Sequence, residues 1–222
     1  MTSVDEEFVR SRTTDVTLRD GTRVRLRPIV PEDKELLIDG FRRLSARSRY
    51  RRFMAPIETL SDDQLRFLTE VDHIDHFAWV ALDLDAEENS GIGVARYVRA
   101  PDEPEVAEAA VIVVDDYQGR GLGTLLLEAL GAVALENGIT RFRGYALEDN
   151  RPLRDVLDML GATTAHDSPG LLRIEIDLPA RAEGLRGSPL SEVLRIAARG
   201  DGPVVLRLGR LEIETPARMR SS

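Results

Sequence analysis

Residues 111–124 read VIVVDDYQGRGLGT, an apolar run followed by a turn that contains three glycines. The apolar run is typical of a strand that is buried on both faces. After the turn, leucine, alanine and valine recur through residues 122–133 at the three- and four-residue spacing of an amphipathic helix. The stretch therefore predicts a buried strand over residues 106–114, a glycine-rich turn, and a helix from residue 121 to about residue 137, closed by Gly138.

The glycine-rich turn is a candidate anion site. It presents backbone N–H groups at a helix N-terminus, where the helix dipole also favours negative charge. Gly119, Gly121 and Gly123 would let phosphate oxygens approach the backbone closely. A purely structural turn is the alternative. The stretch lacks the lysine of a Walker loop, and Leu126 stands where a dinucleotide fingerprint has its third glycine.

The rest of the chain predicts an α/β fold. Asp20-Gly21 is a hairpin turn between short β-prone runs, and Ser61 with Gln64 forms a capping box before a helix. The order of elements predicts a mixed sheet covered by helices. We expect strands at residues 16–18, 24–26, 77–83, 91–99, 106–114, 141–147 and 171–178, and helices at residues 32–43, 45–53, 61–71, 121–137 and 151–160.

At this point the sequence resembles the GNAT N-acetyltransferases. The hexapeptide QGRGLG at residues 118–123 matches their Q/R-x-x-G-x-G/A signature, and NRPLRDVLDMLG at residues 150–161 matches the helix that follows. Within the superfamily, AEAAV at 107–111 and DDYQ at 115–118 look like the bacterial protein-lysine acetyltransferases. The resemblance implies a GNAT fold, a mixed sheet flanked by helices with a V-shaped acetyl-CoA cleft.

The resemblance also implies where the cosubstrate lies. Acetyl-CoA would occupy the gap between strands 106–114 and 141–147. Backbone groups of Val111 and Val113 would meet the pantetheine arm and polarise the thioester carbonyl, and Asn150 would contact the CoA arm. The residues implied for the pyrophosphate are Gln118, Gly119, Arg120, Gly121, Leu122, Gly123 and Thr124.

Glu108 is the candidate general base. A lysine-like amine has a pKa of about 10.4, so reaching the neutral nucleophile near pH 7.4 costs about 4 kcal/mol, which a positioned base helps to recover. The family usually uses a glutamate, and Glu108 lies in the strand that would carry the thioester. The alternative is an ordinary carboxylate facing solvent at a strand end. Glu105 is the second candidate for the base.

The general acid departs from the family pattern. Many members place a tyrosine in the helix after Asn150, and counting along the motif puts Leu157 there. A CoA thiolate leaves tolerably near neutral pH, since thiol pKa values are about 8.5. The acid is therefore water, absent, or one of the nearby Tyr117 and Tyr145.

Composition excludes several classes of function. The chain has no cysteine, which removes disulfides and thiolate chemistry, and a formal net charge of −9, which argues against a nucleic-acid partner. No apolar run reaches the roughly 18 residues of a membrane helix, so we expect a cytoplasmic protein and no membrane partner. His73 and His76 lie three residues apart between acids, but without a third ligand a polar loop is the better interpretation, and no metal is expected.

Arginines gather in the first two predicted helices. They are Arg42, Arg43, Arg47, Arg49, Arg51 and Arg52. In a GNAT fold those helices border the acceptor side. Two interpretations remain open: a solvated helical face, or a surface that recruits an acidic acceptor or partner.

We expect residues 1–15 to be a flexible tail, residues 16–179 to form the acetyltransferase domain, and residues 180–222 to be an extension with a short helix and a hairpin. The alternating apolar residues of 204–208 and 211–214 need a partner surface. That surface is the core's own sheet edge, the acceptor cleft, or a second subunit in a homodimer.

The predicted activity is direct transfer of acetyl from acetyl-CoA to a primary amine. A protein lysine is the first candidate acceptor, by resemblance only. A small-molecule amine or amino acid is the second. A non-catalytic acetyl-CoA-binding regulatory module is the competing class, because fold alone does not decide activity.

Overall fold

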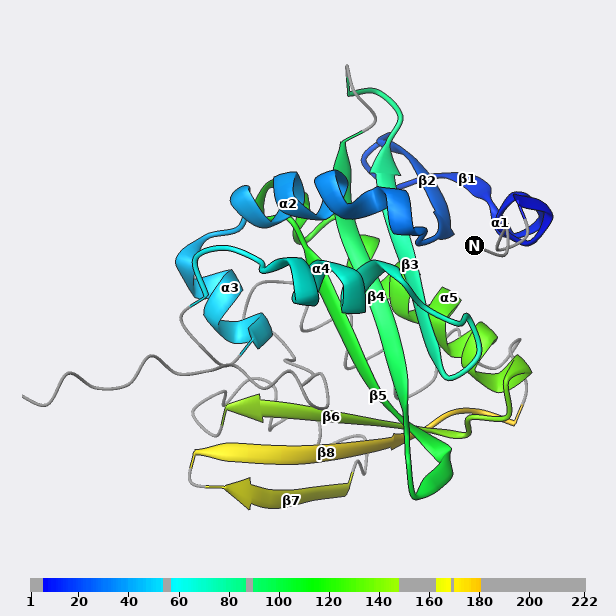
Figure 1. Ribbon diagram of the computed structural model, residues 1–222, viewed down its shortest axis with the longest axis vertical. Coiled ribbons are helices and arrows are strands. Elements are labelled where there is room, and N and C mark those ends of the chain that lie inside the picture. Colours follow the sequence, from blue (N-terminus) through cyan, green and yellow to red (C-terminus); the bar gives the residue numbers. More distant parts are fainter. Residues whose placement is uncertain (1–5, 54–56, 87–89, 148–162, 169, 181–222) are drawn as a thin grey trace, which may run out of the picture.

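The computed structural model describes residues 6–53, 57–86, 90–147, 163–168 and 170–180 (Figure 1). Its elements in chain order are α1 (Glu6–Arg12), β1 (Thr14–Thr17), β2 (Arg23–Pro28), η1 (Pro31–Asp33), α2 (Lys34–Arg42), α3 (Ala46–Phe53), α4 (Asp62–Thr69), β3 (His76–Asp83), β4 (Gly91–Ala100), β5 (Glu103–Val113), η2 (Asp115–Tyr117), α5 (Leu122–Glu136), β6 (Arg141–Leu147), β7 (Thr163–Ser168) and β8 (Leu171–Asp177).

The strands form one mixed sheet in the order β1-β2-β3-β4-β5-β6-β8-β7. Every neighbouring pair is antiparallel except β5 and β6, which are parallel. Helices α2 and α4 lie on one face of the sheet and α5 on the other (Figure 1). This is the mixed α/β sheet that the sequence predicts. Among the described helices, none is long and apolar enough to cross a membrane.

Helix α5 packs closely on β4 at Gly93. A Cβ atom at this position would lie 2.9 Å from Leu126 Cδ1 and 3.2 Å from the carbonyl oxygen of Ile112. Only glycine therefore lets the helix approach the sheet this closely. Leu122, Leu126 and Leu130 of the helix are fully buried in the core on this face. This packing fixes the N-terminus of α5 beside the end of β5.

Several local predictions are confirmed. The β1–β2 hairpin turns at Gly21, whose φ is 91°. Ser61 and Gln64 form the capping box, with the Gln64 amide 3.3 Å from Ser61 Oγ and the Ser61 amide 2.8 Å from Gln64 Oε1. Gly138, with φ at 77°, follows the last turn of α5 as expected. These signals are local, so the sequence carries them directly.

Three local expectations are wrong. Residues 6–12 form helix α1 and Thr14 begins β1, where a tail was expected, because Phe8 packs on His73 with ring centroids 5.0 Å apart. Strand β5 begins at Glu103 instead of residue 106. Strand β7 is not among the expected strands; it is polar, and within the described residues it pairs only with β8, at the sheet edge. The predicted helix 151–160 and the extension after residue 180 lie outside the described residues.

Candidate active site

Strands β5 and β6 separate partway along their length. Their parallel pairing covers only residues 106–108 of β5 and 141–143 of β6. Strand β5 nevertheless continues to Val113, and β6 to Leu147. Figure 1 shows the two strands diverging toward these ends. The predicted separation of the two strands is thus confirmed, and it begins immediately after Glu108.

The backbone of β5 presents polar groups to this opening. The amide of Val114 donates to the carbonyl oxygen of Ile92 on β4 at 3.0 Å. Because backbone groups of an antiparallel strand alternate in direction, those of Val111 and Val113 face away from β4. A hydrogen bond from a side chain agrees with this direction: Nε2 of the Gln118 side chain donates to the Val113 carbonyl oxygen at 3.0 Å.

The glycine-rich turn follows directly at the end of β5. Gly119 has φ at 74° and Gly121 has φ at 88°, both in the left-handed region that glycine adopts most easily. Gly121 is the N-cap of α5, and the backbone amide of Leu125 donates the first hydrogen bond of the helix to the Gly121 carbonyl oxygen at 3.1 Å. The amides of the first turn, from Leu122 to Thr124, therefore have no carbonyl partner within the helix. A Cβ atom placed at Gly121 would have no neighbouring heavy atom within 4 Å, so the space beside this residue is open. This arrangement fits a bound phosphate group.

Two arginines and a tyrosine flank the turn. The guanidinium carbons of Arg120 and Arg43 lie 4.9 Å and 5.6 Å from the centroid of the Tyr117 ring. The Tyr117 hydroxyl donates to Asp83 Oδ2 at 2.6 Å, and this hydrogen bond raises the pKa of the phenol. Arg120 also contacts Asp20 at 3.3 Å in an exposed ion pair. The predicted Arg120 is thus held beside the turn, on the exposed rim.

Glu108 lies at the point where the two strands part. On β5, residues 107 and 109 belong to the core under α5, so Glu108 faces the side of α2 and α4. It is half-buried, and its Oε2 is shielded from solvent. Its register partner on β6 is Arg143, which donates to Glu103 at 2.7 Å and to Glu175 at 2.8 Å. The second candidate, Glu105, is exposed.

Tyr145 is the tyrosine that the structure brings to Glu108. It lies on β6, two residues beyond the last paired residue, and it is buried. Burial raises the pKa of the Tyr145 phenol, and the negative charge of Glu108 raises it further. Tyr117, in contrast, directs its hydroxyl to Asp83. A protonated phenol and a carboxylate therefore flank the start of the opening from two strands.

The predicted residues Asn150 and Leu157 lie outside the described residues. The two histidines of the 72–76 loop have other surroundings. Arg96 Nη1 donates to His76 Nε2 at 3.0 Å, and burial together with that charge lowers the pKa of His76 to about 3. In the described part of the chain, no group of three or more histidine or carboxylate side chains could hold a metal ion.

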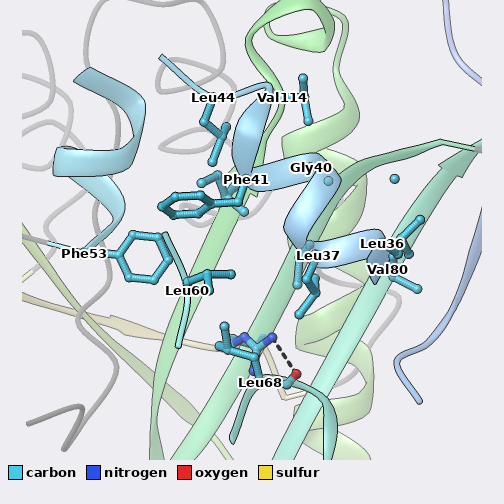
Figure 2. Close-up of a pocket in the computed structure, with 15 residues that line it drawn as sticks. Leu36, Leu37, Gly40, Phe41, Leu44, Phe53, Leu60, Leu68, Val80 and Val114 are labelled. Carbon is cyan, nitrogen blue, oxygen red and sulfur yellow. Dashed lines mark hydrogen bonds between the residues drawn. The ribbon is translucent and has the colours of Figure 1, made fainter. Parts of the chain in front are cut away.

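An apolar pocket that was not expected from the sequence lies on the same face as Glu108. It is open to solvent, and its empty space, with the solvent at its mouth included, is about 590 Å³. Figure 2 shows the rings of Phe41 and Phe53 at one end, with centroids 5.7 Å apart, and a hydrogen bond to the Leu68 carbonyl at the other. Arg96 makes that bond at 3.0 Å. The apolar spacing of Leu37, Phe41 and Leu44 was the available signal.

These features define a family. The model of the acetyltransferase (GNAT) domain matches residues 23–163, which is more than half of the chain. The chain therefore belongs to the GNAT acetyltransferase family. Members of this family use acetyl-CoA, and the glycine-rich turn at the end of β5 is consistent with that cosubstrate.

Three relatives are informative. Acetyltransferase Pat of Mycolicibacterium smegmatis is 37% identical over 164 residues, which cover 74% of this chain and 48% of that protein. Acetyltransferase PA5475 of Pseudomonas aeruginosa is 34% identical over 68% of this chain and 81% of that protein. The crystal structure of the GNAT domain of S. lividans PAT superposes with a TM-score of 0.65 at 35% identity, covering 75% of this chain and 97% of that one. The chain spans about half the length of the M. smegmatis protein.

Proposed function

We propose that the chain transfers acetyl from acetyl-CoA directly to a primary amine, with Glu108 as general base. One observation carries the proposal: Glu108 lies at the residue where β5 and β6 stop pairing. The backbone groups of Val111 and Val113 face the opening just beyond it, and the glycine-rich turn ends the same strand. A base, carbonyl-polarising amides and an anion site thus follow one another along a single strand.

Each part has a chemical task. The carboxylate of Glu108 accepts a proton from the incoming ammonium, directly or through water, which yields the neutral nucleophile. The amide of Val111 donates to the thioester oxygen, where negative charge develops. The amides of residues 119–124, with Gln118 and Arg120 beside them, bind the pyrophosphate.

The two faces of the sheet separate the substrates. Helix α5 and the turn that begins it hold the phosphates from one side, whereas the Glu108 side chain faces α2 and α4. The acceptor amine therefore approaches from the side of α2, α3 and α4. The resemblance of residues 107–118 to protein-lysine acetyltransferases supports a protein lysine as the acceptor.

The Glu108→Gln variant tests the proposal. The amide keeps the shape of the side chain but is not a useful proton acceptor, so we expect the rate of acetyl transfer to fall by about 10²–10⁴-fold. CoA release from acetyl-CoA is measured with a panel of protein, peptide and small-molecule amines, and acetyl-CoA binding is measured by calorimetry. The cosubstrate affinity should stay near the wild-type value.

Two results would contradict this assignment. Turnover near the wild-type rate between pH 6 and 9 would show that Glu108 is not the base, and the matched Glu105→Gln variant would then be measured. Tight acetyl-CoA binding by the wild type without turnover on any amine would favour a regulatory binding module.

A further inference from the structure

We infer that Arg49 and the adjoining apolar pocket recognise a protein acceptor segment in which an acidic residue lies next to a large apolar side chain, about four residues from the acetylated lysine. The inference rests on the proposed function, because it assigns the acceptor side of the same site. It combines an arginine, a pocket and a spacing along β5.

Arg49 has an unusual environment. Its guanidinium carbon lies 5.4 Å from the centroid of the Phe41 ring, and the side chain is half-buried. Its Nε is shielded from solvent and has no hydrogen-bond partner within the described residues. A shielded N–H without an acceptor is unfavourable, because it has lost its hydrogen bond to water. A carboxylate that met the accessible part of this partly desolvated guanidinium would form a charge-assisted hydrogen bond.

Two other arginines nearby, Arg42 and Arg43, are already engaged. Arg42 contacts Asp39 at 3.0 Å, and Arg43 donates to the carbonyl oxygen of Gly91 at 3.2 Å. Arg49 therefore differs from them in the stacked, partly desolvated position of its guanidinium. Because the whole chain carries a formal charge of −9, a positive site on this face is a local feature that favours an acidic partner.

The apolar pocket begins beside Arg49. Phe41, on whose ring the guanidinium rests, lines the pocket together with Leu44 and Phe53. An apolar side chain that enters the pocket would place a neighbouring carboxylate near the guanidinium. This combination of an apolar slot with a charged rim suits a carboxylate attached to an apolar neighbour.

The position of the pocket relative to Glu108 indicates a peptide. Ile112 and Val114 line the pocket, and Glu108 lies four residues before Ile112 on the same strand and the same face. At about 3.3 Å per residue, this separation is about 13 Å. An extended peptide covers that distance in about four residues. A free amino acid does not place its carboxylate at the pocket and its amine at Glu108 at the same time.

Binding of matched peptides tests the inference. The probes are fluorescent twelve-residue peptides with one lysine and, two to five residues to either side, Leu-Glu or its twin Leu-Gln. Fluorescence anisotropy is measured with and without acetyl-CoA. We expect the Leu-Glu peptide of four-residue spacing to bind about tenfold tighter than its twin. A Ser-Glu peptide should lose most of that affinity.

The variants use the same assay. Arg49→Glu should abolish the preference for Glu over Gln, and Arg49→Gln, which keeps most of the stem, should do the same. The control Arg42→Glu changes charge by the same amount on the exposed end of α2 and should keep the preference. Circular dichroism verifies that each variant is folded.

Three results would overturn the inference. They are equal affinity for the twin peptides at every spacing, a preference that survives in both Arg49 variants, and full competition by free N-acetyl-leucine or glutamate. Binding is measured without transfer, so a failure of Glu108 as base leaves the peptide preference intact, and a failure of Arg49 leaves acetyl transfer to a neutral peptide intact.

Discussion

Glu108 and Tyr145 approach the opening between β5 and β6 from opposite strands. Burial raises the pKa of the Tyr145 phenol, and the negative charge of Glu108 raises it further. A phenol with a raised pKa stays protonated throughout the neutral range and is therefore a proton donor. At the residue scale, this pair supplies both an acceptor and a donor of protons, although the family's usual tyrosine position holds Leu157.

We predict that Tyr145 protonates the leaving CoA thiolate. The Tyr145→Phe variant should lower kcat by about tenfold, a modest effect because a thiolate already leaves tolerably at neutral pH. The loss should be uniform between pH 6 and 9, since the raised pKa keeps the phenol protonated there. Steady-state kinetics across this pH range provide the measurement.

The matched control is Tyr117→Phe. The Tyr117 hydroxyl donates to Asp83, away from Glu108, so its removal should lower stability and leave kcat within about twofold. If Tyr145→Phe retained the wild-type kcat at every pH, water would be the proton donor.

Strand β5 is the element that organises the site. Its first part pairs with both neighbours, whereas its last part pairs with β4 alone, and its end continues into the turn that caps α5. One continuous stretch therefore holds the base, the polarising amides and the anion site at fixed separations. The close approach of α5 to Gly93 fixes the orientation of that stretch.

We predict that Gly121→Glu abolishes acetyl-CoA binding. Position 121 has φ at 88° and caps the helix that would face the pyrophosphate. A glutamate there adds a negative charge and bulk where an anion binds. Calorimetry with acetyl-CoA should show a loss of affinity of at least a hundredfold.

The control for backbone strain is Gly138→Glu at the opposite end of α5. Gly138 also has a positive φ, 77°, with open space around its α-carbon. It should be destabilised to a similar extent and keep its affinity for acetyl-CoA. Equal affinities in the Gly121 variant and the wild type would exclude the turn as the pyrophosphate site.

Elements whose signals are local could be predicted from the sequence. The capping box at Ser61, the turn at Gly21 and the apolar stripe of α5 depend on residues only a few positions apart. Helix α1 and strand β7 could not, because α1 is held by Phe8 against His73, 65 residues away, and β7 by pairing with β8. Tertiary contacts determine such elements.

In the candidate site, too, some features follow from local sequence and others depend on tertiary contacts. The glycine-rich turn and Glu108 follow from a contiguous motif, and the register places them as expected along β5. The environment of Arg49 and the proximity of Tyr145 to Glu108 depend on residues from separate elements. No local pattern encodes these distances, so they required the structure.

At the scale of the whole molecule, a half-buried histidine, His76, links stability to pH. His76 begins β3 and accepts a hydrogen bond from Arg96, which is itself buried. Burial first, and then the charge of Arg96, lowers the pKa of His76 to about 3, while Asp72 acts in the opposite direction and His73 adds to the lowering. In the unfolded chain the pKa is about 6.5. The folded state therefore keeps His76 neutral over a range in which the unfolded state binds a proton.

We predict a loss of stability in acid that begins near pH 6.5. Above that pH, His76 is neutral in both states and contributes no dependence on pH. Between pH 6.5 and about 3, only the unfolded state gains the proton, so the free energy of unfolding falls by about 1.4 kcal/mol per pH unit.

The His76→Gln variant tests this prediction, because it keeps an oxygen acceptor for Arg96 and removes the titratable group. Urea unfolding at pH 7.5, 6.5 and 5.0 should show that the wild type loses about 2 kcal/mol more than the variant between pH 7.5 and 5.0. The difference between the two pH values is the test, because a constant offset from the altered hydrogen bond cancels in it. Parallel decreases for the two proteins would show that His76 is not the group that couples folding to protons.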